Sequence, residues 1–231
     1  MNKFQIPPVE GAGGGLSPKG MQRRQFLTKL AGAASVAAVV SGCSKDDNDN
    51  SGINLGSGDP GILNYAYALE QLEAAFYTQV ILTPYTGITA DEKALLTDIR
   101  DHEIAHREFF KNALGSKAIV SLEVNFSAID FTSRASVLAT AKAFEDLGVS
   151  AYNGAGKLIT DGTYLLLAGK IVSVEARHAA YIRDLISNGS FADSTVIDAN
   201  GLDKAQTPKQ VLSVASKFLK SKLNANNLPT S

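Results

Sequence analysis

Two copies of the motif Glu-x-x-His constrain this chain more than any other feature of its sequence. They read EIAH at 103–106 and EARH at 175–178, and they use two of the three histidines in the 231 residues. In a helix, residues three, four and seven positions apart lie on one face. Each motif shares such a face with apolar residues, so its acid and imidazole are expected to point into a helical core: Ile99, Glu103, His106 and Phe110 in one helix, and Ile171, Glu175, His178 and Ile182 in the other.

Two further helical stretches each carry a glutamate followed seven positions later by a tyrosine. These pairs are Glu70 with Tyr77 and Glu145 with Tyr152. Glu73 lies near the same face as Glu70, and we favour Glu70 because only that register makes Tyr77 the counterpart of Tyr152. The chain therefore repeats one formula, a Glu-x6-Tyr helix followed by a Glu-x-x-His helix.

Other ionisable residues near these motifs are expected to lie outside the core. Asp146 and Glu108 are predicted to be solvated. His102 precedes Glu103 but points to a different face, so it is predicted to lie at the surface or beside the site.

Helix start and stop signals divide the chain into four long helices. Asp59-Pro60 precedes an unbroken stretch at 61–82, and the sequence TADE at 89–92 is a capping box. A β-branched, non-periodic segment at 116–131 predicts an extended crossing, and Thr207-Pro208 starts a short amphipathic helix. The sequence predicts an all-α four-helix bundle with one long crossover between helices two and three, with helices at 61–82, 93–114, 134–160 and 163–187 and a short C-terminal helix at 209–223.

Four glutamates on core-facing stripes require a compensating charge. Buried carboxylates without partners would cost many kcal/mol. Two divalent cations balance four carboxylates, and each histidine adds one neutral nitrogen ligand. Single glutamates on two helices and Glu-x-x-His on the other two form the ligand set of dimetal carboxylate bundles.

With these six positions, the tyrosines and the crossover, residues 59–189 resemble the ferritin-like superfamily, especially its exported ferritin-like domain proteins. The resemblance implies two iron ions, with manganese as the alternative, that react with dioxygen or hydrogen peroxide in an oxidoreductase. A non-catalytic metal-binding or stress- and desiccation-related envelope protein is the other function that it allows. The resemblance also implies the individual roles: Glu70 and Glu145 as ligands from the single-glutamate helices, Glu103 and Glu175 as bridging ligands, His106 and His178 as terminal imidazoles, and Tyr77 and Tyr152 as hydrogen-bond donors to ligand carboxylates.

The N-terminal segment has the pattern of an export signal. Arg23 and Arg24 precede a short apolar run that ends at Cys43, an order typical of a signal peptide. Residues 1–43 resemble a twin-arginine lipoprotein signal in which Cys43 is lipidated; an ordinary signal peptide with an incidental cysteine is the alternative, and either Met1 or Met21 can be the start. Residues 44–58 are predicted to be a flexible tether. We expect an exported lipoprotein that is periplasmic, anchored to the outer membrane or exposed at the cell surface.

Composition excludes several function classes. The net charge of −1 gives no basic surface for nucleic acid. The single cysteine excludes a disulfide framework or a thiolate metal cluster within one chain, and no methionine follows residue 21, so a haem held between two methionines is not expected. The expected partners are metal ions, a small oxidant, the membrane through Cys43 and a second copy in a homodimer. Residues 190–231 are predicted to form a loop and the short amphipathic helix.

Overall fold

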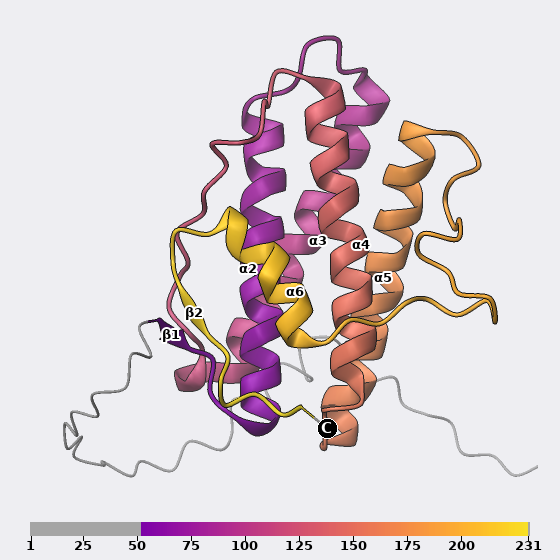
Figure 1. Cartoon of the computed structure of the whole chain (residues 1–231). Helices are drawn as coiled ribbons and strands as arrows, with labels where there is room; N and C mark the ends of the chain where they lie inside the picture. Colours follow the sequence, from indigo (N-terminus) through magenta and orange to yellow (C-terminus); the bar gives the residue numbers. More distant parts are fainter. Residues whose placement is uncertain (1–51, 231) are drawn as a thin grey trace, which may run out of the picture. The chain divides into compact units, whose positions relative to one another are not determined.

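The computed structural model describes residues 52–230, and the part it describes is mostly helical (Figure 1). The prediction of an all-α, ferritin-like four-helix bundle with one long crossover is confirmed. Two strands, β1 and β2, pair in parallel, with Ile53 opposite Leu223. The elements in chain order are β1 (Ile53–Asn54), α2 (Gly58–Leu82), α3 (Ala90–Leu114), α4 (Arg134–Gly156), α5 (Gly162–Ile186), α6 (Pro208–Ala215) and β2 (Leu223–Asn224), with short 3-10 turns at Gly115–Lys117 and Ser216–Phe218.

Local capping explains where the helices begin and end. The side-chain oxygen of Thr89 accepts a hydrogen bond from the N–H of Glu92, and the N–H of Thr89 donates one to the carboxylate of Glu92, which completes the predicted capping box of α3. Asp161 accepts from the first N–H groups of α5. Gly115 ends α3 with a φ of 55°, a left-handed conformation that favours glycine.

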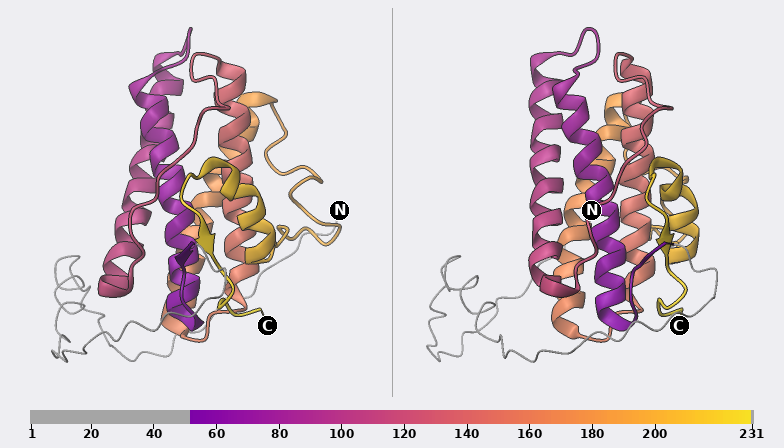
Figure 2. Two further views of the ribbon diagram at one scale, coloured as in Figure 1. Left: turned by 60° about the vertical axis from the view of Figure 1, so that its left-hand side comes forward. Right: turned by 90° about the vertical axis from the view of Figure 1, so that its left-hand side faces the viewer.

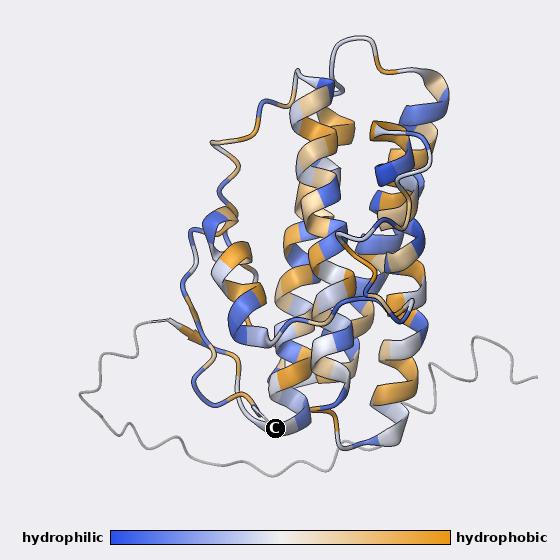
Figure 3. Cartoon of the chain, turned by 45° about the vertical axis from the view of Figure 1, so that its right-hand side comes forward, coloured by the Kyte–Doolittle hydropathy of each residue, from blue (hydrophilic) through white to orange (hydrophobic). Residues whose placement is uncertain are grey.

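The four long helices form two packed pairs. α2 packs against α3, and α4 packs against α5, while α2 and α4 join the two pairs along the bundle (Figure 2). Figure 3 shows hydrophobic and hydrophilic residues interleaved along these helices, as expected where each helix buries one face. The core contains several aromatic side chains, and burying one large apolar side chain contributes roughly 1.5–3 kcal/mol. Large side chains that are fully buried include Tyr65, Phe76, Leu96, Leu138, Phe144 and Ile182.

The crossover between α3 and α4 runs along α2. The N–H of Ile119 donates to the side chain of Asn64, and the N–H of Leu122 donates to the side chain of Gln71. Val124 forms an isolated bridge with Leu219 of the C-terminal segment. These contacts supply hydrogen-bond partners for an extended segment that has no sheet of its own.

Three element boundaries differ from the sequence prediction. α4 ends at Gly156 rather than near residue 160, because the N–H groups of Thr160 and Asp161 donate to the carboxylate of Asp59 instead of continuing the helix. α6 ends at Ala215 rather than near residue 223, because the following residues pair with the crossover and with β1. The predicted flexible tether extends to residue 58, whereas Leu55 is fully buried, so the packed structure begins earlier than expected.

The predicted signal and its functional residues lie outside the described residues. This applies to Arg23, Arg24 and Cys43 and to the whole segment 1–43. Within residues 52–230, no helix combines the length and apolar character that crossing a membrane requires.

Gly154 of α4 marks the closest approach of the C-terminal part of the chain to the bundle. A Cβ atom added there would lie 1.8 Å from the carbonyl oxygen of Gln206, and the N–H of Gln206 donates to the carbonyl of Ser150 over 2.9 Å. Gly154→Ala is therefore expected to displace this segment and to lower the free energy of unfolding by about 2 kcal/mol or more.

Gly169→Ala on α5 is the matched control, because no neighbouring atom lies within 4 Å of the added methyl group. It is expected to raise the free energy of unfolding by about 0.5–1 kcal/mol, since alanine is the better helix former. Chemical denaturation of both variants measures the difference. Equal stabilities would show that residue 206 is not held against α4.

Candidate metal centre

The six residues predicted from spacing converge in the middle of the bundle. The residues come from all four long helices: Glu70 from α2, Glu103 and His106 from α3, Glu145 from α4, and Glu175 and His178 from α5. They form two overlapping groups of four, and in each group the potential ligand atoms all lie within 4.8 Å of one another. All four glutamates are fully buried. Such an arrangement can hold metal ions.

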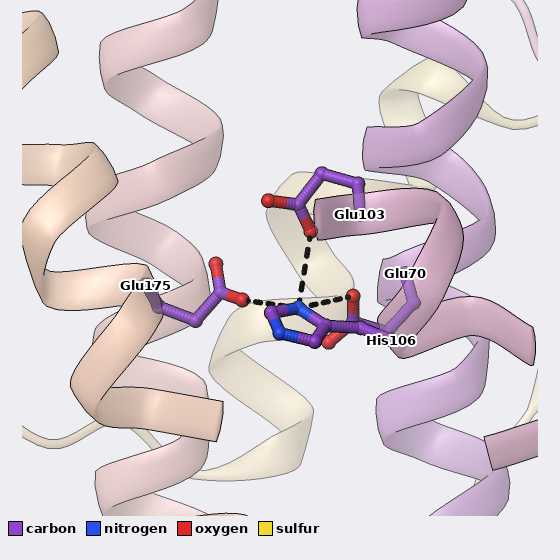
Figure 4. A group of neighbouring side chains, drawn as sticks. All are labelled: Glu70, Glu103, His106 and Glu175. Carbon is purple, nitrogen blue, oxygen red and sulfur yellow. Dashed lines mark ion pairs between the residues drawn. The ribbon is translucent and has the colours of Figure 1, made fainter. Parts of the chain in front are cut away.

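His106 is the centre of the first group (Figure 4). Its Nδ1 atom lies 3.5 Å from Oε2 of Glu70, 3.6 Å from Oε2 of Glu103 and 2.9 Å from Oε1 of Glu175. The side chain of His106 is 13% exposed, so the group borders solvent only through this imidazole.

His178 is the centre of the second group. Its Nδ1 atom lies 2.9 Å from Oε1 of Glu103, 3.4 Å from Oε2 of Glu145 and 3.9 Å from Oε2 of Glu175. Glu103 and Glu175 therefore present one oxygen to each imidazole, whereas Glu70 and Glu145 each belong to one group.

The two tyrosines hold the glutamates that belong to one group only. The hydroxyl of Tyr77 donates to Oε1 of Glu145 over 2.5 Å, and the hydroxyl of Tyr152 donates to Oε1 of Glu70. Each bond occupies the oxygen that does not face an imidazole. The Oε2 atoms of Glu70 and Glu145 are therefore left directed at the cluster, and the carboxylates are fixed in orientation.

Eight buried atoms at the centre of the cluster have no hydrogen-bond partner. The imidazole nitrogens and carboxylate oxygens lie within ion-pair distance, yet none of these contacts has hydrogen-bond geometry. An unpaired buried polar atom costs about 1–3 kcal/mol, so eight together indicate a cluster suited to binding cations. The atoms are Oε2 of Glu70, both carboxylate oxygens of Glu103 and of Glu175, Oε2 of Glu145, and Nδ1 of His106 and His178.

His102 contacts the far side of one imidazole. Its Nδ1 atom lies 3.0 Å from Nε2 of His178, and the two rings are nearly parallel, with an interplanar angle of 8°. If Nε2 of His178 carries the proton and donates it to His102, Nδ1 of His178 presents a lone pair to the cluster. His102 was predicted to lie either at the surface or beside the site. Both descriptions hold, because its side chain is exposed and also contacts His178.

Electrostatics within the cluster favour the protonated forms of both imidazoles and of Glu175. Burial by itself lowers the pKa of His106, but contacts with Glu103, Glu175 and Glu70 outweigh it and raise the pKa to about 12. The pKa of His178 is raised to about 10 in the same way, by contacts with Glu103 and Glu145 that outweigh burial. Burial and the charge of Glu103 raise the pKa of Glu175 well above its usual value. Cations placed here would compete with these protons.

Two of the neighbouring acids behave differently from each other. Glu108 pairs with Arg107 at the surface, as expected for a solvated side chain. The prediction for Asp146 is wrong: its carboxylate accepts two hydrogen bonds from the guanidinium of Arg183, whose side chain is 2% exposed. A buried guanidinium requires a paired anion, and this need could not be deduced from the residues around Asp146 in the sequence.

Comparison with known proteins supports the same region. Residues 58–188, more than half of the chain, match the family model described as a ferritin-like domain. No curated protein shows detectable similarity in sequence. The matched region begins with α2, ends after α5 and contains all six residues of the cluster.

Proposed function

We propose that this chain, which belongs to the ferritin-like domain family, binds two iron ions at the six-residue cluster and uses them to oxidise iron(II) or to consume hydrogen peroxide. The observation that carries the proposal is the set of eight buried nitrogen and oxygen atoms without hydrogen-bond partners. Four carboxylates and two imidazoles are a ligand set that suits iron and manganese.

Charge balance supports two cations rather than one. Each group contains one imidazole and three carboxylates, and two of the carboxylates are shared. Two divalent cations neutralise the four carboxylates, whereas a single cation would leave two buried negative charges. Glu103 and Glu175 would contribute to holding both ions, because one oxygen of each faces each imidazole.

The residues of the chain would position and protect the centre. Tyr77 and Tyr152 hold Glu145 and Glu70 so that one oxygen of each is directed at the cluster. His102 orients the imidazole of His178 from the exposed side. Such orienting contacts are typically worth 10–100-fold in metal affinity, as an order of magnitude.

When bound, two iron(II) ions would supply one electron each, and these two electrons together with two protons reduce hydrogen peroxide to two waters. Burial of the cluster limits the reactant to a small molecule such as peroxide or dioxygen, since the side chains of His106 and His178 are only 13% and 6% exposed. An export signal with lipidation at Cys43 would place this chemistry in the cell envelope.

Anaerobic titration of the full chain with iron(II), followed by addition of hydrogen peroxide, tests the proposal. We expect two iron ions per chain, a near-ultraviolet absorbance change on oxidation, and the loss of one peroxide for every two iron ions. Glu108→Gln at the surface is the control for removal of a carboxylate and is expected to behave like the parent. Tight metal binding without peroxide consumption would favour the non-catalytic, stress-related function, and an absence of metal binding would exclude both.

A further inference from the structure

A fifth glutamate lies beside the cluster. Glu73 is 5% exposed and follows Glu70 by three residues on α2, so both side chains lie near one face of that helix. It belongs to neither group of four. Among residues 52–230, Glu73 takes part in no hydrogen bond or ion pair, although a buried carboxylate is among the most costly groups to leave unpaired.

Gly148 of α4 provides the space for this carboxylate. A Cβ atom added to Gly148 would lie 3.2 Å from Oε1 of Glu73 and 3.6 Å from Oε2 of Glu175. Both oxygens therefore border the same small space. Oε2 of Glu175 is the oxygen directed at His178, so Glu73 approaches the cluster on the side of the second group.

The two halves of the bundle carry different residues at the position of Glu73. The same number of residues separates Glu70 from Glu145 and Tyr77 from Tyr152, and that interval also takes Glu73 to Gly148. Where the first half has an acid, the second half has the residue that makes room for it.

The small pocket beside Glu73 offers it nothing to bind. A pocket of about 10 Å³ adjoins the side chain of Glu73 and the backbone of Gly148, and the remaining walls are the apolar residues Leu69, Leu72, Phe144 and Leu147. Burial, and then the charges of Glu175 and Glu103, raise the pKa of Glu73 well above its usual value. A cation at the cluster is the partner that would satisfy this side chain.

We propose that Glu73 is a seventh protein ligand of the metal centre, which reaches the cluster through the space left by Gly148 and adapts it to trivalent ions. The inference rests on the proposed metal binding. Four carboxylates neutralise two divalent cations, and a fifth leaves one negative charge in excess. Two trivalent cations carry six positive charges, so a fifth carboxylate brings the total closer to neutrality. Glu73 thus stabilises the trivalent pair and contributes little to binding of the divalent pair.

Competition titrations of the full chain with gallium(III) and cobalt(II) against nitrilotriacetate test the proposal without any turnover. Glu73→Gln keeps the shape of the side chain and removes its charge. We expect its affinity for gallium(III) to fall by about tenfold or more, while the affinity for cobalt(II) stays within about threefold of the parent. Glu108→Gln, which removes a surface carboxylate, is the control and should change neither affinity.

A second set of variants separates ligation from folding. Gly148→Ala should weaken gallium(III) binding because its methyl group would crowd Oε1 of Glu73, and the same substitution should have no effect in a Glu73→Ala background, where that oxygen is absent. Circular dichroism checks that each variant is folded. Unchanged gallium(III) affinity in Glu73→Gln, or a Gly148→Ala effect that persists without Glu73, would overturn the inference. Failure to consume peroxide would instead overturn the proposed function and leave these affinity ratios intact.

Discussion

Glu175→Gln is expected to prevent the binding of a metal pair and at the same time to stabilise the metal-free protein. Glu175 is fully buried, and neither of its oxygens has a hydrogen-bond partner. Because its oxygens face both imidazoles, the change weakens both metal positions, and we expect a loss of at least about 100-fold in affinity, more than is usual for residues that only orient a ligand.

The stabilising half of this prediction follows from the same burial. In the metal-free protein, burial and the charge of Glu103 raise the pKa of Glu175, which means that the ionised form is costly there. A neutral amide removes this cost. We expect the midpoint of thermal unfolding to rise by about 2–8 °C, which corresponds to roughly 1–2 kcal/mol for a chain of this size.

The same substitution is expected to weaken metal binding and to stabilise the metal-free protein, and a general loss of folding would not produce both effects. Metal content and calorimetric titration with manganese(II) or iron(II) measure the first effect, and scanning calorimetry in the presence of a chelator measures the second. Glu108→Gln is again the control, since Glu108 lies at the surface beside Arg107. A Glu175→Gln variant that retains two ions per chain would contradict the assignment.

The bundle and its six central residues were predictable because both depend on local periodicity. Helical spacing places Glu103 with His106, and Glu175 with His178, whatever the helices later contact. Capping signals such as Thr89 gave the start of α3 correctly, because a cap satisfies N–H groups within its own turn.

Features that depend on partners distant in sequence were not predictable. The pairing of β1 with β2 joins residues near opposite ends of the described chain, and the two-residue strands carry no periodic signal. The ion pair of Asp146 with Arg183 joins α4 to α5 and the loop that follows. Glu73 shares its helix face with Glu70, so periodicity alone could not show that both are buried; this depends on the packing of α2 against the other helices.

The metal-free and metal-loaded proteins are expected to respond to pH in opposite directions. Burial, partly opposed by contact with His106, raises the pKa of Glu70 from 4.5 to about 7. The pKa of His178 rises from 6.5 to about 10, because its contacts with carboxylates outweigh burial. The folded metal-free protein therefore binds more protons than the unfolded chain, and its stability falls as pH rises. Glu70 contributes to this loss between about pH 4.5 and 7, and His178 between about pH 6.5 and 10.

Metal binding reverses the slope, since cations displace these same protons and bind more tightly as pH increases. Burial by itself raises the pKa of Glu103, but contacts with His106 and His178 outweigh it and lower the pKa to about 2. Glu103 therefore affects the stability only at pH values below about 4.5, outside the range of this experiment. Between pH 5.5 and 9 we expect the unfolding midpoint of the metal-free protein to fall by roughly 10 °C, while the stabilisation by saturating manganese(II) grows. Thermal unfolding at several pH values, with chelator or with metal, gives both curves. Parallel curves would mean that the protons held by the cluster and the cations do not compete, and the six side chains would then not be the ligands.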